Sequence, residues 1–459
     1  MRIVTTVVVA LTLTAAAVPA AVPAAGAAEP DPPGTDGVWR TDGYGTVLTV
    51  GGGVLQEYQT TSVGCLKGDT SPQTGPGTFL TTDGTLLTVR TGHDRDHATL
   101  AADSSVGHRK LRRIAALPSA CTRGLPDDPR TSFDVFWQTF EENYPFFAAK
   151  GIDWHAVRDR YRPQVHKNTT GKELFTIFSR MVRPLYDAHV VVQNGDSRFY
   201  EVRPGTEVPT EELDTRVKKF IVARDLKNAS RRQDFAAGRI TYADLPGNRG
   251  YLRISGFGGY AGKDAPYSAE QAELDRALDT VLTTERVERL KGLIIDLRIN
   301  GGGADTLGIR IARRLTDTPY PAYAKRVRND PADPARHTRP EPVAVTPADA
   351  PRYTGPVAVL TGGSTVSAGE TFTQALMDRP GRTVRIGRST QGVFSDVMVR
   401  HLPDGMVFAL PNEEFLTRTG RTFDGTGIPP HIAEPVFTKE EFAKGRDSAF
   451  DRAVNILGN

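Results

Sequence analysis

The stretch "KGLIIDLRINGGGADTLGIRIARRLTD", residues 291–317, contains a strand pattern, three glycines and a helix pattern in succession. The apolar run 292–297 fits a buried strand, and the segment 303–317 fits the helix that follows it. Glycines 301–303 allow left-handed backbone angles that can turn N–H groups toward an anion. The stretch therefore predicts a strand–turn–helix unit of an α/β core, with its chemistry at the turn.

The same order of elements recurs on both sides of this stretch. Upstream, the strand pattern "GYLRISGF" at 250–257 leads to the helix pattern 268–290. Downstream, "GPVAVLTG" at 355–362 leads to a helix that begins near residue 367. The repetition predicts an α/β core over 246–437.

The remainder of the chain divides by composition and period. Short Thr- and Val-rich strands with Gly turns predict a small all-β module over 37–122. Aromatic residues at i, i+3, i+4 and i+7 predict a helical bundle over 127–199, with the aromatic stripe as a buried face rather than a ligand platform. The polar segment 200–245 is expected to connect the bundle to the core, and 438–459 to form a C-terminal helix.

The N-terminal segment predicts export. Residues 1–28 have a short positive head, an apolar stretch and an Ala-rich end, which is typical of a signal peptide cleaved near Ala27 or Ala28. An uncleaved anchor is the alternative, which two prolines in the apolar run disfavour. Residues 29–36 are interpreted as a linker, so the mature protein is expected to be secreted.

Two cysteines and the charge balance limit the function further. Cys65 and Cys121 are the only cysteines of the chain, and in an exported protein such a pair most often forms a disulfide. The 459 residues carry a net charge of +3, with basic and acidic residues interleaved. No basic stripe with aromatic residues is present, so a nucleic-acid partner is not expected. No stable membrane span is expected either.

The stretch "GGSTVSAGE", 362–370, presents two serines where a strand leads into a helix. At such a turn the helix amides and the helix dipole favour the negative charge that follows attack by a serine on a carbonyl. Ser364 or Ser367 could equally cap the helix, and the local pattern leaves both readings open. A Gly-x-Ser-x-Gly elbow is absent because residue 365 is threonine.

The glycine turn and the serine turn together favour acyl transfer. The turn 301–303 is not followed by Gly-Lys-Ser, and Gly-x-Gly-x-x-Gly is absent, so the turn does not match a nucleotide-binding motif. An anion cradled there is then a developing oxyanion, with a purely structural turn as the alternative.

Three motifs in this order resemble a known family. "GLIIDLRINGGG", "STVSAGE" and "FDGTGIPPHI" are similar to the signatures of the C-terminal-processing and tricorn-core serine peptidases, over roughly 127–437. The resemblance implies a crotonase-like αβ spiral core beside the helical bundle, with Ser367 as nucleophile. It also implies an oxyanion hole made by the N–H groups of Gly302 and Ala368, and no organic cofactor or metal.

The residue that activates the serine differs between branches of that family. The tail-specific branch uses a lysine, but Val393 stands at its place in "GRSTQGVFS". "LYDAHVVV", 185–192, resembles the histidine step of the tricorn-like branch, which implies His189 as general base. The glutamate that orients the histidine in that branch is replaced here by Asp424, and a preceding serine by Ala188. The segment 200–245 is short for a PDZ module, and none is expected.

One further polar cluster is "GHDRDHATL", 92–100, with two histidines and two aspartates. These side chains could bind zinc, but a polar hairpin turn explains them more simply. No metal site is predicted.

The sequence thus predicts a secreted serine peptidase of the PDZ-less, tricorn-like branch, which acts on a peptide or protein through an acyl-enzyme at Ser367, His189 and Asp424. The alternatives are a binding protein on the same scaffold that has lost hydrolysis, and an esterase or amidase for small molecules. The oligomeric state and the role of the β module stay open.

Overall fold

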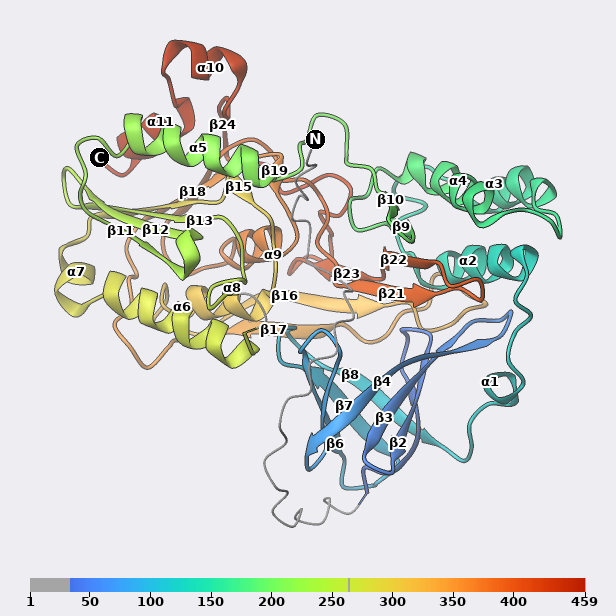
Figure 1. The fold of residues 1–459 in the computed structure, drawn as a ribbon. Helices are drawn as coiled ribbons and strands as arrows, with labels where there is room; N and C mark the ends of the chain where they lie inside the picture. Colours follow the sequence, from blue (N-terminus) through green and yellow to red (C-terminus); the bar gives the residue numbers. More distant parts are fainter. Residues whose placement is uncertain (1–33, 263–264, 459) are drawn as a thin grey trace.

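The computed structural model describes residues 34–262 and 265–458, and it is a mixed α/β protein of several regions (Figure 1). The predicted signal peptide, residues 1–28, and most of the predicted linker lie outside the described residues. No helix of the described ranges is long and apolar enough to cross a membrane.

An eight-stranded closed barrel forms the N-terminal region, drawn in blue in Figure 1. Each strand pairs antiparallel with the next, and the first strand closes the barrel on the last. Its inside is filled by apolar side chains such as Trp39, Leu55 and Leu111. The all-β character predicted for this region is confirmed. The strands are β1 (Gly37–Thr41), β2 (Thr46–Gly51), β3 (Val54–Thr60), β4 (Cys65–Gly75), β5 (Thr78–Leu80), β6 (Leu86–Thr91), β7 (His97–Ala102) and β8 (Arg109–Ile114).

The predicted disulfide is present. Cys65 at the start of β4 is bonded to Cys121 in the short helix α1 (Ser119–Arg123). The bond ties the barrel to the segment that leads into the next region.

Three helices follow, drawn in green at the right of Figure 1: α2 (Pro129–Asn143), α3 (Trp154–Tyr161) and α4 (Gly171–Val182). The aromatic stripe of α2 is buried, as expected, with Phe133, Phe136 and Phe140 fully covered. The region 127–199 is not purely helical, however. It also contains β9 (Val191–Asn194) and β10 (Ser197–Phe199), which join β22 (Val407–Pro411) and β21 (Val397–His401) in a sheet under the helices. Pairing between strands this far apart in the chain leaves no local pattern, so the sequence does not predict this sheet.

A seven-stranded sheet forms the α/β core, in the order β11-β12-β13-β14-β18-β20-β24. The strands from β13 to β24 are parallel, and β11 and β12 are antiparallel additions at one edge. The strands are β11 (Ser230–Phe235), β12 (Ile240–Leu245), β13 (Arg249–Ile254), β14 (Gly292–Asp296), β18 (Val357–Thr361), β20 (Thr383–Gly387) and β24 (Ile432–Ala433).

The segment 200–245 differs from the prediction. It contains the helix α5 (Glu211–Arg224) and then β11 and β12, so it is part of the core sheet rather than a connection to it. The exposed, charged pattern of β11 explains why the sequence did not reveal a strand at a sheet edge.

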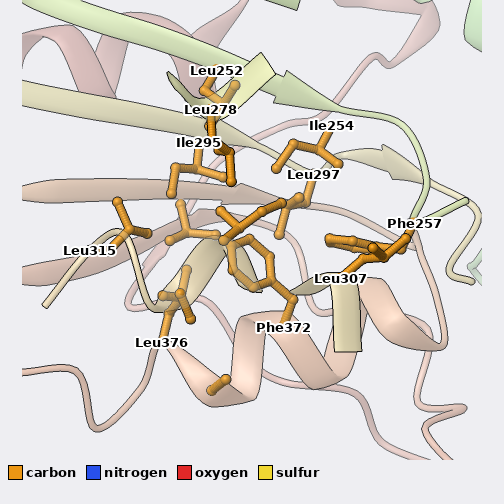
Figure 2. Packing of buried hydrophobic residues seen from close by; sticks show 14 of the residues in the cluster. Leu252, Ile254, Phe257, Leu278, Ile295, Leu297, Leu307, Leu315, Phe372 and Leu376 are labelled. Carbon is orange, nitrogen blue, oxygen red and sulfur yellow. The ribbon is translucent and has the colours of Figure 1, made fainter. Parts of the chain in front are cut away.

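Helices cover both faces of the core sheet. On one face, Leu252, Ile295 and Leu297 of the sheet region pack against Phe372 and Leu307 of two helices (Figure 2). The helices of the core are α6 (Tyr267–Val281), α7 (Thr284–Arg289), α8 (Asp305–Ala312) and α9 (Ala368–Ala375). The segment predicted as one helix over 268–290 is therefore two, α6 and α7.

Short strands beyond the main sheet complete the core. β15 (Ile299–Asn300) and β19 (Ser364–Thr365) form a parallel pair, and β16 (Tyr320–Val327), β17 (Glu341–Val345) and β23 (Glu413–Leu416) form a three-stranded sheet. At the C-terminus, the single helix expected over 438–459 is replaced by α10 (Lys439–Lys444) and α11 (Ser448–Ile456), which are separated at the left-handed Gly445.

Candidate active site

Ser367 occupies the strand-to-helix turn between β19 and α9. It is the residue before the first turn of α9, and its backbone has φ 53° and ψ −125°. A positive φ is costly for a residue with a Cβ atom, and such strain concentrates at functional sites because the surrounding structure must enforce it. In the first turn of α9, the Gly369 N–H donates to the Val366 carbonyl, and the Glu370 and Thr371 N–H groups donate to the Ser367 carbonyl. Among the described residues the Ala368 N–H has no such acceptor, so it is the helix amide available to an anion.

Ser364 has a different role. Its hydroxyl is buried and donates a hydrogen bond of 2.8 Å to the carbonyl oxygen of Glu207. Neither Ser364 nor Thr365 is placed as a nucleophile, because the Thr365 hydroxyl also donates to a backbone carbonyl, that of Leu297. Of the hydroxyls in 362–370, Ser367 is the one at the strained turn.

The glycine turn 301–303 lies directly against Ser367. A Cβ atom added to Gly302 would lie 2.5 Å from Ser367 Cβ and 3.1 Å from Ser367 Oγ. Gly302 also has φ +77°, so only glycine meets both requirements without strain. Its N–H donates to Asn300 Oδ1 at 2.9 Å. An oxyanion at this position therefore has to replace the Asn300 oxygen as the acceptor of that N–H.

The pairing of β15 with β19 brings these two turns together. Ile299 lies opposite Ser364, and Asn300 opposite Thr365. The turns that follow the two strands are therefore adjacent, although about sixty residues separate them in the chain.

Val393, at the place of the absent lysine, packs against the serine turn. The Ser367 N–H donates to the Val393 carbonyl at 3.0 Å, and the Val393 side chain lies in a small apolar cluster with Val366 and Ala188. Glu370 holds this segment from beneath, since its carboxylate accepts the N–H groups of Gly392 at 2.6 Å and Val393 at 2.7 Å. Burial raises the pKa of Glu370 to about 7. The sequence analysis assigned no role to Glu370, although it belongs to the serine motif.

His189 reaches the same place from the helical region. Its neighbour Ala188 contacts Val366 and Val393, which flank Ser367 in space. The imidazole is 5% exposed, and burial lowers its pKa, while the charges of Asp187 and Asp396 act in the opposite direction. Its Nδ1 has no hydrogen-bond partner among the described residues. A buried, neutral imidazole can accept a proton near pH 7.

Asp187 fixes the turn that carries His189. One carboxylate oxygen accepts the His189 N–H at 3.1 Å, and the other accepts the hydroxyl of Tyr144 at 2.8 Å. Lys150 lies 3.9 Å away. The motif "LYDAH" contained this residue, but only the folded chain gives it a partner directly after α2.

Asp424 is buried next to the 392–395 segment. Its carboxylate accepts the Phe394 N–H at 3.2 Å and the Thr422 hydroxyl at 2.7 Å, and within the described part of the chain no hydrogen bond joins it to His189. Burial raises the pKa of Asp424 well above its ordinary value. The structure thus gathers Ser367, Gly302, Ala368 and the His189 segment, and it places Asp424 behind the segment that contacts Ser367.

A lysine that the sequence analysis did not consider also lines the site. Lys325 of β16 is buried in the cavity that contains Ser367, with its ammonium 3.4 Å from Asp396 and 3.3 Å from Glu413. These carboxylates raise the pKa of Lys325, so it is a fixed cation and not a proton acceptor.

No group of side chains with the composition of a metal site occurs in the described ranges. The polar cluster 92–100 forms the exposed turn between β6 and β7, where His97 pairs with Asp94 at 2.6 Å.

Comparisons with known proteins give a consistent result for the region that carries these residues. Residues 248–434 match the model of peptidase family S41, and residues 125–183 match that of the tricorn protease C1 domain. A comparison of the sequence with curated proteins gives no match.

Two solved structures show the same architecture. A candidate peptidase from Parabacteroides merdae is 25% identical, with a TM-score of 0.61, and the match covers 72% of this chain and 96% of that one. Mature CPAF in complex with lactacystin is 12% identical, with a TM-score of 0.51, and the match covers 72% of this chain and 97% of that one. The latter likeness concerns the fold alone. The region 248–434 is thus similar to peptidase family S41, and the family matches together with the shared architecture identify the protein as a serine-type peptidase.

Proposed function

We propose that this protein is an exported peptidase that cleaves peptide bonds through an acyl-enzyme on Ser367, with His189 as the general base. The observation that carries the proposal is the strained backbone of Ser367 at the start of α9, in contact with the glycine turn at Gly302. A fold keeps such a residue only when packing enforces it, and the position combines an accessible hydroxyl with helix amides.

In this mechanism Ser367 Oγ forms a bond to the carbonyl carbon of the substrate, and its proton passes to the His189 imidazole. The tetrahedral intermediate carries its negative charge toward the N–H groups of Ala368 and Gly302. Gly302 donates to Asn300 in the absence of substrate, which keeps the N–H oriented until an oxyanion replaces the amide oxygen. The imidazolium then returns the proton to the leaving amine, and water hydrolyses the ester by the reverse sequence.

The acid that orients His189 is proposed to be Asp424, on the basis of its place before the "GTGIPP" step. Because burial raises its pKa, Asp424 acts as a neutral hydrogen-bonding group more readily than as a counter-charge. Asp187 already supports the His189 backbone, which makes it the comparison residue. Asp424→Ala removes the hydrogen-bonding group; if it lowers kcat no more strongly than Asp187→Ala, the assignment of Asp424 is wrong.

The test of the proposal is active-site labelling. An alkyl fluorophosphonate is expected to label the wild-type protein, detected as a mass increase on the peptide that contains Ser367, and not to label Ser367→Ala. Labelling is accompanied by hydrolysis of members of a fluorogenic peptide panel. Absence of both from the wild-type protein contradicts the proposed activity and favours a binding protein on this scaffold. Equal or faster cleavage of an ester than of a peptide with the same acyl group, with no peptide cleaved efficiently, favours an esterase.

Two further assignments belong to this proposal. Export rests on the leader 1–28, and it is tested by N-terminal sequencing of protein recovered from the medium of the producing cell. The crotonase-like assignment of the core is supported by the repeated unit of long strand, short strand and helix, β14–β15–α8 and β18–β19–α9.

A further inference from the structure

The serine turn and the inside of the N-terminal barrel line one cavity. Its volume is about 490 Å³, and its walls include Ser367, Gly303 and Ala304 on the core side. The opposite wall consists of barrel residues from β2, β3, β6, β7 and β8. Volumes of this size are typical of sites for small ligands or short peptide segments. Figure 1 shows the barrel beneath the strands β16, β17 and β21 that support this part of the core.

The cavity has a polar rim and, inside the barrel end that faces Ser367, an apolar floor that is incompletely filled. Leu48, Leu55 and Leu100 are buried and form the floor of the cavity inside the barrel. Leu87 and Ala102 line the same cavity and are partly exposed. An eight-stranded barrel is just wide enough to be filled by its side chains or to hold one small ligand. Here the side chains fill the far part and leave the end near the serine open.

The barrel is fixed in this position by polar and apolar contacts. Tyr44 Oη donates to Glu413 at 2.6 Å, and Ser105 Oγ donates to Asp396 at 2.5 Å. Val106, from the β7–β8 connection, is buried in the main apolar cluster of the peptidase core. These contacts hold the barrel wall against the core, so that it forms one side of the cleft next to Ser367.

The charges around the cavity are compensated by one another. Lys325 lies between Asp396 and Glu413, and Arg400 pairs with Glu57 at 3.2 Å. Arg109, a third cation, stacks over the ring of Tyr44 at 4.5 Å from its centroid. With its charges engaged in this way, the cavity leaves its apolar floor as the surface that discriminates between substrates.

We propose that the barrel is the specificity domain of the peptidase, and that its open end receives a bulky apolar side chain of the peptide whose scissile bond lies at Ser367. This inference rests on the proposed function. It goes beyond that function because the barrel, residues 37–114, lies outside both family matches, which cover 125–183 and 248–434.

The first test fills the open end. Ala102→Phe places a ring in the cavity, and Ala101→Phe is the matched control, because Ala101 lies on the outer face of β7 while Leu100 and Ala102 face inward.

kcat/KM is measured on peptides that differ only in one residue near the scissile bond, which is Ala, Val, Leu or Phe. Each value is divided by the rate at which an alkyl fluorophosphonate labels the same preparation, so that loss of folded enzyme cancels. Ala102→Phe is expected to lower the Leu and Phe values about tenfold or more relative to Ala, through KM, since a misfit of a few methylene groups costs 10- to 200-fold. Ala101→Phe is expected to keep the wild-type preference.

The second test enlarges the open end, and it can still be carried out if Ala102→Phe does not fold. Leu87→Ala is expected to raise the ratio of kcat/KM for the Phe peptide to that for the Ala peptide several-fold. Thr88→Ala, on the outer face of the same strand, is the control. An unchanged preference in both Ala102→Phe and Leu87→Ala overturns the specificity role of the barrel.

A binding measurement separates this inference from the proposed function. The same peptides are titrated into Ser367→Ala, with and without Ala102→Phe, and binding is followed by fluorescence polarisation. If the double variant binds more weakly while the wild-type protein is neither labelled nor active, the proposed function is contradicted and the role of the barrel is not. Cleavage by the wild-type protein, with equal binding of all peptides to both variants, contradicts the role of the barrel alone.

Discussion

Two turns of the core follow the same order of long strand, short strand and helix, but one turn consists of glycines and the other carries a serine side chain. After β14 and β15 the chain turns through Gly301–Gly303 into α8, and after β18 and β19 it turns through Ser367 into α9. Both long strands are completely buried, and the short strands pair in register. At the glycine turn a side chain at Gly302 or Gly303 collides with its surroundings, since a Cβ atom at Gly303 would lie 2.0 Å from the Phe257 carbonyl oxygen. At the serine turn a side chain is present and its backbone is strained instead.

The difference shows how one scaffold serves two tasks. In the proposed mechanism, the turn without side chains brings a backbone N–H close to the reacting carbonyl, and the strained turn holds a hydroxyl toward the same point. Neither turn completes the site alone. The following predictions test this division, from the largest expected effect to the smallest.

Ser367→Ala removes the group that the strained turn presents. We expect kcat/KM for peptides to fall by about 10⁴-fold or more, since loss of a nucleophilic serine leaves only the background of binding and oxyanion stabilisation. Ser364→Ala is the control on the same turn. It loses the hydrogen bond to Glu207 and is expected to cost about 1 kcal/mol in the free energy of unfolding while activity is retained. A larger loss of activity in Ser364→Ala than in Ser367→Ala means that the wrong serine was chosen.

His189→Ala removes the proposed base. The expected fall in kcat is about 10⁴-fold. His166→Ala, at an exposed position before α4, is the control and is expected to match the wild-type rate. Circular dichroism establishes that both variants are folded. Near-normal turnover by His189→Ala contradicts the assignment of the base.

Gly302→Ala adds a side chain to the turn that lacks one. The new Cβ atom meets Ser367 at 2.5 Å, and φ +77° is unfavourable for alanine, so we expect kcat to fall by about 10²–10³-fold through loss of the oxyanion donor. Gly301→Ala is the matched control, because the nearest atom to its Cβ is 3.8 Å away. Similar rates for the two variants mean that Gly302 does not form part of the oxyanion hole.

Glu370 supports the segment that contacts the serine turn, and its raised pKa predicts a pH-dependent stability. A carboxyl group with a pKa of about 7 in the folded state, against the reference value 4.5, holds its proton more tightly when folded. Its contribution is therefore fully present below about pH 4.5 and is lost as the pH rises through 7.

Glu370→Gln does not titrate at this position, so the difference in unfolding free energy between the variant and the wild type isolates the effect. The difference is expected to move in favour of the variant by roughly 3 kcal/mol between pH 4 and pH 8, in urea unfolding at both values. A difference that does not depend on pH shows that Glu370 is not protonated in the folded protein at neutral pH.

The smallest effect concerns the acidic limb of the pH–rate profile. Burial lowers the pKa of His189 from 6.5, so the midpoint of kcat/KM on the acidic side is expected below that value. Asp396→Asn removes a charge that favours the imidazolium, and it is expected to lower the midpoint further, by less than about one unit. A midpoint that rises in this variant contradicts the role of Asp396. Since the pKa is lowered, the neutral His189 contributes stability that is present above about pH 6.5 and is lost as the pH falls.

Part of this site was open to prediction because its signals are local. The apolar run 292–297 with its glycines, and "STVSAGE" before an amphipathic helix, specify strand, turn and helix within short windows, and both units formed as predicted. The resemblance of these motifs to a peptidase family then selected Ser367 over Ser364. The disulfide between Cys65 and Cys121 followed from the number of cysteines in a chain that is expected to be exported.

Other features depend on contacts between distant segments and leave no such signal. The strands β11 and β12 are recognised only when β12 pairs with β13 and β11 with β12, because a charged edge strand such as β11 has the local pattern of a loop. The partner of Asp187 is Tyr144, the residue after α2, and the carboxylates around Lys325 are those of Asp396 and Glu413.

The sequence by itself determined the α/β units, the serine and glycine turns, the disulfide and the similarity to a peptidase family. Only the tertiary structure decided that Ser367 takes a strained backbone against Gly302, and that the open end of the barrel faces it. The physical reason is the range of the interactions. Periodicity and turn chemistry act over a few residues, whereas the strain at Ser367 and the docking of Tyr44 on Glu413 are enforced by packing between segments far apart in the chain.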